Sequence, residues 1–213
     1  MSTASAEAKQ SSVEPAEAGV ESAIAKTRTI GASPAFGILM AVLGAVGLFF
    51  SALIINDHIT LLSDPDYEPV CSVNEVVSCV DVMASPEAEA FGFSNTYFGL
   101  VGFAMVVFFG VALAARVRFP EWMWLGLLVG LTLAVAFIHW LAYASVFTIG
   151  ALCMYCIAVW IATLPLFLMT LVRFVRGRAH NRGRATGEGI AQPIIVLVAW
   201  YLGFAVVIGT HFM

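Results

Sequence analysis

Residues 122–172 read WMWLGLLVGLTLAVAFIHWLAYASVFTIGALCMYCIAVWIATLPLFLMTLV, a nearly unbroken apolar stretch. A single helix over this range would measure about 75 Å, whereas the hydrocarbon core of a bilayer is about 30 Å thick. The stretch must therefore fold back on itself. Basic residues flank it on both sides: Arg116, Arg118, Arg173, Arg176 and Arg178. If both flanks face the cytoplasm, the stretch holds an even number of crossings, with its turn near Tyr143–Gly150.

The whole chain has the composition of an integral membrane protein. It is 61% hydrophobic and 11% charged, whereas soluble domains carry about 25% charged residues. Five apolar runs have about the ~20 residues that a membrane-crossing helix needs. These predicted spans are Ala35–Asn56, Thr96–Ala115, Trp122–Ala142, Ala151–Val172 and Gln192–Phe212. The predicted fold class is an all-α integral membrane protein with five transmembrane helices.

Charge predicts the orientation of these spans. All 10 basic residues lie in the N-terminal tail or in the loops that follow the second and fourth spans. The loop from Asp57 to Asn95 holds eight acidic residues and no Lys or Arg. By the positive-inside rule, the N-terminus is expected in the cytoplasm and this loop outside. Residues 1–33, rich in Ala, Ser and Glu, are predicted to be a disordered cytoplasmic tail, and residues 34–213 the membrane domain.

Four cysteines form two pairs on one predicted side of the membrane. Cys71 and Cys79 enclose seven residues of the outer loop, and Cys153 and Cys156 form a C-x-x-C pair at the start of the fourth span. Cys153 precedes Arg173 by twenty residues, roughly 30 Å along a helix, which places it at the outer membrane face. Two pairs on an oxidising side predict a disulfide relay, because thiolate attack through mixed disulfides carries two electrons between them.

Two alternatives come from other functional classes, namely a metal-binding membrane protein and a structural membrane bundle. Zinc-binding cysteine pairs usually enclose two to four residues, whereas Cys71 and Cys79 enclose seven. A bridge between Cys153 and Cys156 would close almost no loop and would add little stability. Both alternatives are therefore disfavoured, and no metal site is predicted.

Three segments resemble the vitamin K epoxide reductase family, in its bacterial disulfide-forming branch. They are Cys71-Ser-Val-Asn-Glu-Val-Val-Ser-Cys79, Ser94-Asn-Thr-Tyr-Phe-Gly99 and Cys153-Met-Tyr-Cys156. With the spans around them, the resemblance covers about Ile38–Val172. It implies a four-helix bundle around a quinone, a fifth helix beside it, and the cysteine loop as an extracytoplasmic cap. Many bacterial members continue into a thioredoxin-like domain, and since this chain ends at Met213, a separate redox partner is expected.

The resemblance also implies catalytic roles for the four cysteines. Cys153 and Cys156 match the active-site pair, with Cys156 beside the quinone. Cys71 and Cys79 match the loop pair that exchanges electrons with it. The matching spacing suggests that Cys79 contacts Cys153 while Cys71 meets the partner.

Two further residues are candidates for quinone binding. Asn95 matches an asparagine that donates a hydrogen bond to a quinone carbonyl, although from the sequence alone it could equally be the N-cap of the second span. Trp160 stands where the epoxide-reducing branch has a tyrosine, four residues after Cys156 and on the same helix face. Trp160 offers an N–H donor in place of a hydroxyl, which disfavours epoxide reduction more than quinone reduction.

Together these features predict a quinone-dependent thiol oxidase of the bacterial inner membrane. It would reoxidise an extracytoplasmic thioredoxin-fold, DsbA-like protein and so support disulfide bond formation. The expected electron acceptor is menaquinone or ubiquinone from the quinone pool. Membrane lipid is an expected partner, and nucleic acid is not. Within the family, a vitamin K epoxide or quinone reductase is the alternative.

Overall fold

The computed structural model describes residues 28–64, 66–74, 76–183 and 191–212. Five long helices are present in this part of the chain, all long and apolar enough to cross a membrane. They are α2 (Pro34–Ser63), α4 (Thr96–Ala114), α5 (Glu121–Ala144), α6 (Met154–His180) and α7 (Ala191–Phe212). The predicted fold class, an all-helical membrane protein with five spanning helices, is confirmed.

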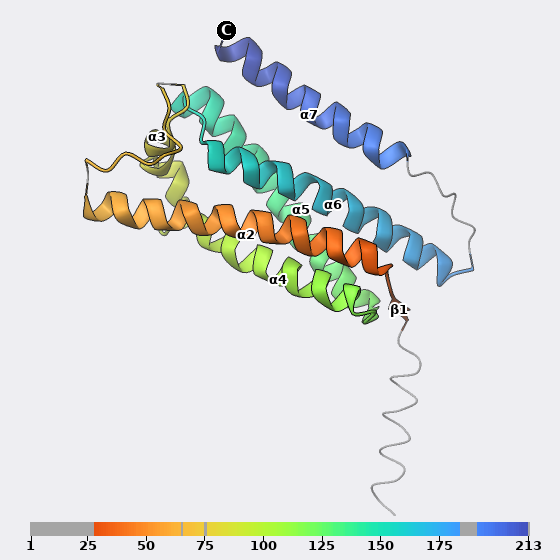
Figure 1. The fold of residues 1–213 in the computed structure, drawn as a ribbon. Helices are drawn as coiled ribbons and strands as arrows, with labels where there is room; N and C mark the ends of the chain where they lie inside the picture. The colour runs from red at the N-terminus through yellow and green to blue at the C-terminus, as the bar shows by residue number, and fades with distance from the viewer. Residues whose placement is uncertain (1–27, 65, 75, 184–190, 213) are drawn as a thin grey trace, which may run out of the picture.

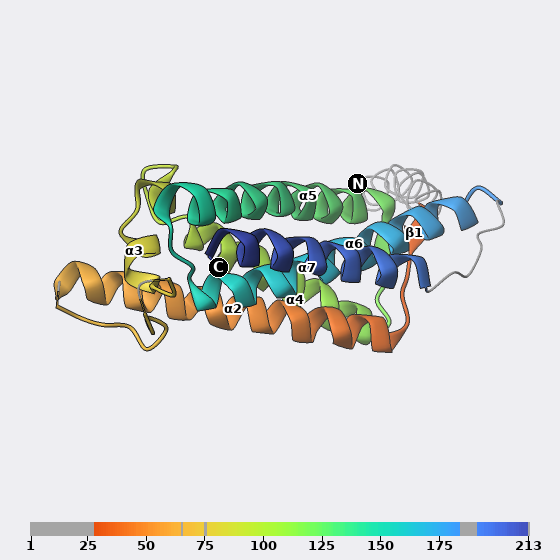
Figure 2. The same ribbon diagram turned by 90° about the horizontal axis from the view of Figure 1, so that it is seen from above.

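Four of the helices form a bundle, and α7 lies along one flank of it (Figures 1 and 2). α2 packs against α4 and α6, α6 packs against α5, and α7 packs against α6. One end of the bundle carries the short helices α3 (Cys79–Met83), η1 (Pro86–Glu89) and η2 (Ser145–Ile149), and is called here the cysteine end. The opposite end carries β1 (Thr29–Ile30) and β2 (Phe119–Pro120).

The last part of the predicted disordered tail, residues 1–33, includes strand β1 at this opposite end. β1 pairs with β2 in antiparallel register, with Ile30 opposite Phe119. Ile30 is buried, and its carbonyl accepts a hydrogen bond from the Trp124 indole at 3.0 Å. Residues 1–27 of the predicted tail lie outside the described residues, but its last part is this ordered strand. Local composition does not reveal the strand, because its partner lies some 90 residues further along the chain.

Glycines bring α2 and α4 into close contact. A Cβ atom added at Gly37 would lie 2.3 Å from the backbone nitrogen of Ala114, and one added at Gly110 would lie 2.5 Å from that of Ala41. Small residues at helix interfaces are typical of membrane proteins, because they let two backbones approach closely. This contact fixes the start of α2 against the end of α4, at the end of the bundle opposite the cysteines.

The ends of the spans differ from the prediction at the cysteine end. α2 continues past Asn56 to Ser63, about two further turns. The predicted outer loop, residues 57–95, is therefore a helix end followed by a shorter loop. α6 begins at Met154 and continues to His180, so the predicted fourth span began too early and ended too early. The predicted turn near Tyr143–Gly150 lies too early, because α5 and η2 keep the chain helical to Ile149. The chain leaves the helix at Gly150, whose φ of 73° is a conformation that glycine adopts without strain.

Two side-chain hydrogen bonds attach α7 to the bundle. The Trp200 indole donates to Nε2 of His139 at 2.8 Å, and the Tyr201 hydroxyl donates to the carbonyl of Ile161 at 2.8 Å. Nδ1 of His139 lies 2.6 Å from the carbonyl of Val135. Because Nε2 accepts a hydrogen bond, Nδ1 carries the ring proton and donates a hydrogen bond to that carbonyl. His139 is thus a fully bonded side chain that holds α7.

Candidate active site

The four cysteines lie together at the cysteine end. Cys71, Cys79 and Cys153 are at most 1% exposed and belong to one apolar cluster with Ile54 of α2. Cys156 is half-buried and packs on the edge of this cluster. The fold thus brings the loop pair and the C-x-x-C pair into direct contact.

The two pairs are in different redox states. A disulfide joins Cys71 to Cys79, whereas Cys153 and Cys156 are free thiols. Sγ of Cys79 lies 3.3 Å from Sγ of Cys153. At this distance a Cys153 thiolate needs little movement to exchange with the loop disulfide.

Polar side chains hold the backbone of the cysteine loop where secondary structure does not. Oγ of Ser72 accepts a hydrogen bond from the backbone N–H of Cys79 at 3.0 Å. Ser78 caps α3 by accepting from the backbone N–H of Asp81 at 3.3 Å. The side chain of Asn74 accepts from two further backbone N–H groups. These local bonds fix the position of Cys79 relative to Cys71.

Cys153 is the N-cap of α6 and lies just before the spanning segment. Its Sγ accepts a hydrogen bond from the backbone N–H of Cys156 at 3.5 Å. The side-chain hydrogen bond with Cys156 lowers the pKa of the Cys153 thiol, and the backbone N–H groups of Cys156 and Tyr155 act in the same direction against burial. A thiolate at a helix N-terminus is also favoured by the helix dipole. Cys153 is therefore suited both to attack a disulfide and to leave from one.

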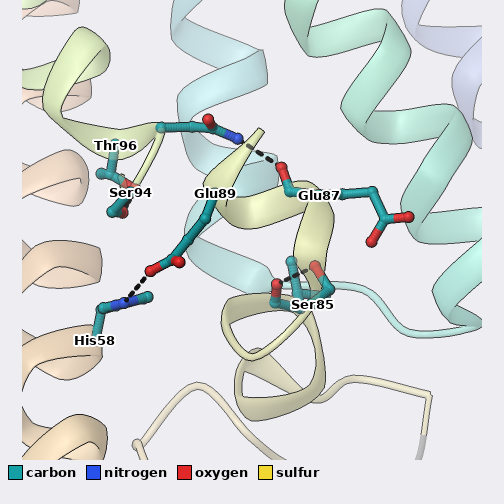
Figure 3. Close-up of polar contacts among 8 residues, drawn as sticks. His58, Ser85, Glu87, Glu89, Ser94 and Thr96 are labelled. Carbon is teal, nitrogen blue, oxygen red and sulfur yellow. Dashed lines mark hydrogen bonds and ion pairs between the residues drawn. The ribbon is translucent and has the colours of Figure 1, made fainter. Parts of the chain in front are cut away.

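Asn95 is buried, 7% exposed, at the N-cap position of α4, but its side chain makes no capping hydrogen bond. Its Nδ2 instead donates to the backbone carbonyl of Glu87 at 2.6 Å (Figure 3). Its Oδ1 is buried and has no hydrogen-bond partner within the described residues. The asparagine thus anchors η1 and presents an unused acceptor.

Trp160 is buried in a second apolar cluster beside the cysteines. It packs with Ile138 of α5 and Leu164 of α6, and its ring lies 6.1 Å from that of Phe204 of α7. Cys156 packs against the same cluster. In the described structure, no hydrogen bond joins Asn95 to Cys156 or to Trp160.

Comparison with known protein families gives a match to the Vitamin K epoxide reductase family over residues 38–171. This range includes the four cysteines, Asn95 and Trp160. The chain belongs to this family. No curated protein matches the chain. Membership of the vitamin K epoxide reductase family makes the protein a membrane oxidoreductase whose disulfide chemistry is coupled to quinone-type substrates.

In this member of the vitamin K epoxide reductase family, sequence reasoning missed two polar residues of α2. Asp57 is 6% exposed, and its Oδ1 accepts a hydrogen bond from the Tyr67 hydroxyl at 3.3 Å. Nε2 of His58 lies 3.3 Å from the Glu89 carboxylate (Figure 3). The two residues were overlooked because the predicted span ended at Asn56. The signal was present, since an acid next to an apolar membrane span marks a candidate functional residue.

The state of the cysteines bears on the alternative of a metal site. Cys71 and Cys79 are bonded to each other, so neither offers a thiolate ligand in this state. Among the described residues, no group of three or more His, Cys, Asp and Glu side chains could hold a metal ion.

Proposed function

We propose that this member of the vitamin K epoxide reductase family is a quinone-dependent thiol oxidase. It reoxidises a separate, DsbA-like thioredoxin-fold protein outside the cytoplasm of a bacterium. The observation that carries the proposal is the 3.3 Å contact between Sγ of Cys79, which is already in the loop disulfide, and Sγ of the free Cys153. This contact supports electron transfer between the two pairs by thiol–disulfide exchange.

The proposed relay passes two electrons from the partner to the loop pair and then to the C-x-x-C pair. The partner dithiol reduces the Cys71–Cys79 bond and becomes a disulfide. Cys79 then attacks Cys153 and releases Cys156, after which Cys71 attacks Cys79 and releases Cys153. The loop disulfide is restored and the C-x-x-C pair is reduced, which is the combination of redox states found here. The quinone supplies the final oxidising step, since it takes up two electrons and two protons and becomes a quinol.

The residues at the start of α4 and along α6 fit a quinone. Nδ2 of Asn95 uses one hydrogen on Glu87, so its second hydrogen is proposed to bind a quinone carbonyl. Its buried Oδ1 has no partner in the described structure and could accept from a quinol hydroxyl. Trp160 is proposed to line the apolar side of this site next to Cys156. Menaquinone and ubiquinone both carry the carbonyl groups that this arrangement requires.

The purified protein is expected to oxidise a reduced thioredoxin-fold protein only when menaquinone or ubiquinone is added. Two protein thiols should disappear for each quinol formed, because the couple transfers two electrons. Thiol loss by alkylation and quinol formation by absorbance measure the two sides of the reaction. A metal-binding protein would instead purify with bound metal and lose it on chelation. Turnover of vitamin K epoxide without quinone reduction would contradict the proposal in favour of the epoxide reductase alternative.

Single cysteines introduced at the two ends of the bundle test the proposed orientation. In a chain whose native cysteines are serine, Glu68→Cys should react with a membrane-impermeant maleimide in intact cells, whereas Arg182→Cys should not. Both positions are exposed, and basic loops stay in the cytoplasm. Permeabilised cells, in which both must react, provide the control. Labelling of Arg182→Cys alone in intact cells would reverse the orientation.

A further inference from the structure

A buried carboxylate faces the cysteine cluster from α2. Asp57 lies three residues after Ile54 and four residues before Leu61, so the three side chains share one face of the helix. Ile54 is a member of the apolar cluster that contains Cys71, Cys79 and Cys153, and Leu61 packs against it. Asp57, 6% exposed, is therefore directed to the same cluster.

The side chain of Asp57 is held by hydrogen bonds at the cysteine end. Its Oδ1 accepts hydrogen bonds from the Tyr67 hydroxyl at 3.3 Å and from Nδ2 of Asn56 at 3.4 Å. The neighbouring His58 is paired with Glu89 instead. The titratable side chains that interact with Asp57 are Tyr67 of the loop and Tyr155 and Cys153 at the start of α6.

The charge of Asp57 acts on the Cys153 thiol. Although the hydrogen bond with Cys156 lowers the pKa of Cys153 overall, the nearby negative charge of Asp57 works against this and raises it. Such a charge has a strong effect in a site from which water is excluded. It disfavours the Cys153 thiolate, and it therefore disfavours the reduced pair relative to the Cys153–Cys156 disulfide at every pH at which Cys153 is ionised in that pair.

We propose that the Asp57 carboxylate sets the redox potential of the Cys153–Cys156 pair, so that this pair releases electrons instead of retaining them. The pair takes up two electrons and two protons when its bond breaks, and it gives up both when the bond re-forms. A charge that disfavours the reduced pair therefore makes it a stronger reductant. The direction of electron flow, from the loop pair to the quinone, rests on the proposed function, whereas the potential is a property of the chain itself.

Asp57→Asn tests this role because it removes the charge and keeps an acceptor for Tyr67. The full-length protein is equilibrated in glutathione buffers of defined ratio without added quinone, and each cysteine pair is read by differential alkylation and peptide mass spectrometry. The equilibrium constant for reducing Cys153–Cys156 is expected to rise about tenfold in the variant, a shift of about +30 mV for this two-electron couple. The pH at which Cys153 becomes half-reactive toward an alkylating agent should fall in parallel.

Matched variants distinguish the effect of the Asp57 charge from the effect of disturbing the structure around the cysteines. Asp81→Asn removes an exposed acid two residues from Cys79, and Tyr67→Phe removes the hydrogen bond but keeps the Asp57 carboxylate; both should retain the wild-type potential. Asp57→Ser, a second neutral variant, must shift the potential of the Cys153–Cys156 pair as Asp57→Asn does. The proposal is wrong if the neutral variants stay within twofold of wild type, or if Asp81→Asn shifts equally. If the neutral Asp57 variants shift the potential as expected but the protein does not reduce quinone, the proposed function is wrong and the role of Asp57 stands.

Discussion

Cys156→Ser is expected to stop quinone-dependent thiol oxidation and to accumulate an internal Cys79–Cys153 disulfide. Sγ of Cys79 lies 3.3 Å from Sγ of Cys153, so the Cys153 thiolate can attack the loop disulfide at Cys79. Without Cys156, the C-x-x-C pair cannot form its own disulfide, and only the freed loop thiol can reopen the mixed bond; alkylating that thiol traps the bridge. Turnover should fall by about a thousandfold or more, the scale of loss that follows removal of a nucleophile.

Peptide mapping under non-reducing conditions identifies the trapped bridge. Cys153→Ser is the matched control, because it should be equally inactive but should form no bridge to the loop. Trapping at Cys71 in place of Cys79 would reverse the two loop roles while leaving the relay intact. Full activity of Cys156→Ser would contradict the relay and favour a structural role for the cysteines.

Asn95→Ala and Asn95→Asp are both expected to lose quinone reduction by about 10²–10³-fold, the range seen when one preorganised donor to a developing oxyanion is removed. Both variants lack the amide N–H, and Asp adds a charge that repels the reduced ring. The assay follows quinol formation by the purified variants. A capping residue would behave differently, since Asp caps a helix as well as Asn does.

Because Asn95 also holds η1 through Glu87, a second readout is needed. Trapping of the Cys79–Cys153 bridge in the Cys156→Ser background requires no quinone, and it should proceed normally in both Asn95 variants. Ser94→Ala is the matched control, since Ser94 is a buried neighbour whose hydroxyl bonds to Thr96 (Figure 3). If trapping fails along with turnover, Asn95 anchors the loop and the quinone-binding role is wrong.

The number of spans was predictable from the sequence, whereas their ends at the cysteine end were not. Each span needs only enough apolar residues to cross the bilayer, and composition reports this directly. The helical residues Asp57 and His58 were placed in a loop, because polar side chains near a span normally mark its end. Their partners Tyr67 and Glu89 come from the loop itself, and such contacts exist only in the folded chain.

The sequence likewise identified candidate residues of the site, but it did not predict which residues those side chains contact. The spacing of the cysteines and the family motifs identified the two pairs. That Asn95 would donate to Glu87, and that Trp160 would pack against Phe204 of α7, did not follow. Apolar helices in a bilayer lack a hydrophobic driving force for one particular partner, so their packing depends on shape that composition does not specify.

The burial of the loop disulfide has a consequence for selectivity. Cys71 and Cys79 are 1% and 0% exposed, so a small thiol in the surrounding medium reaches their sulfur atoms only when the loop opens, and its reaction with them is expected to be slow. A folded protein that binds the loop has enough contact area to displace it, and a tripeptide thiol does not. Under the proposed function, this slow reaction would keep low-molecular-weight thiols from drawing on the quinone.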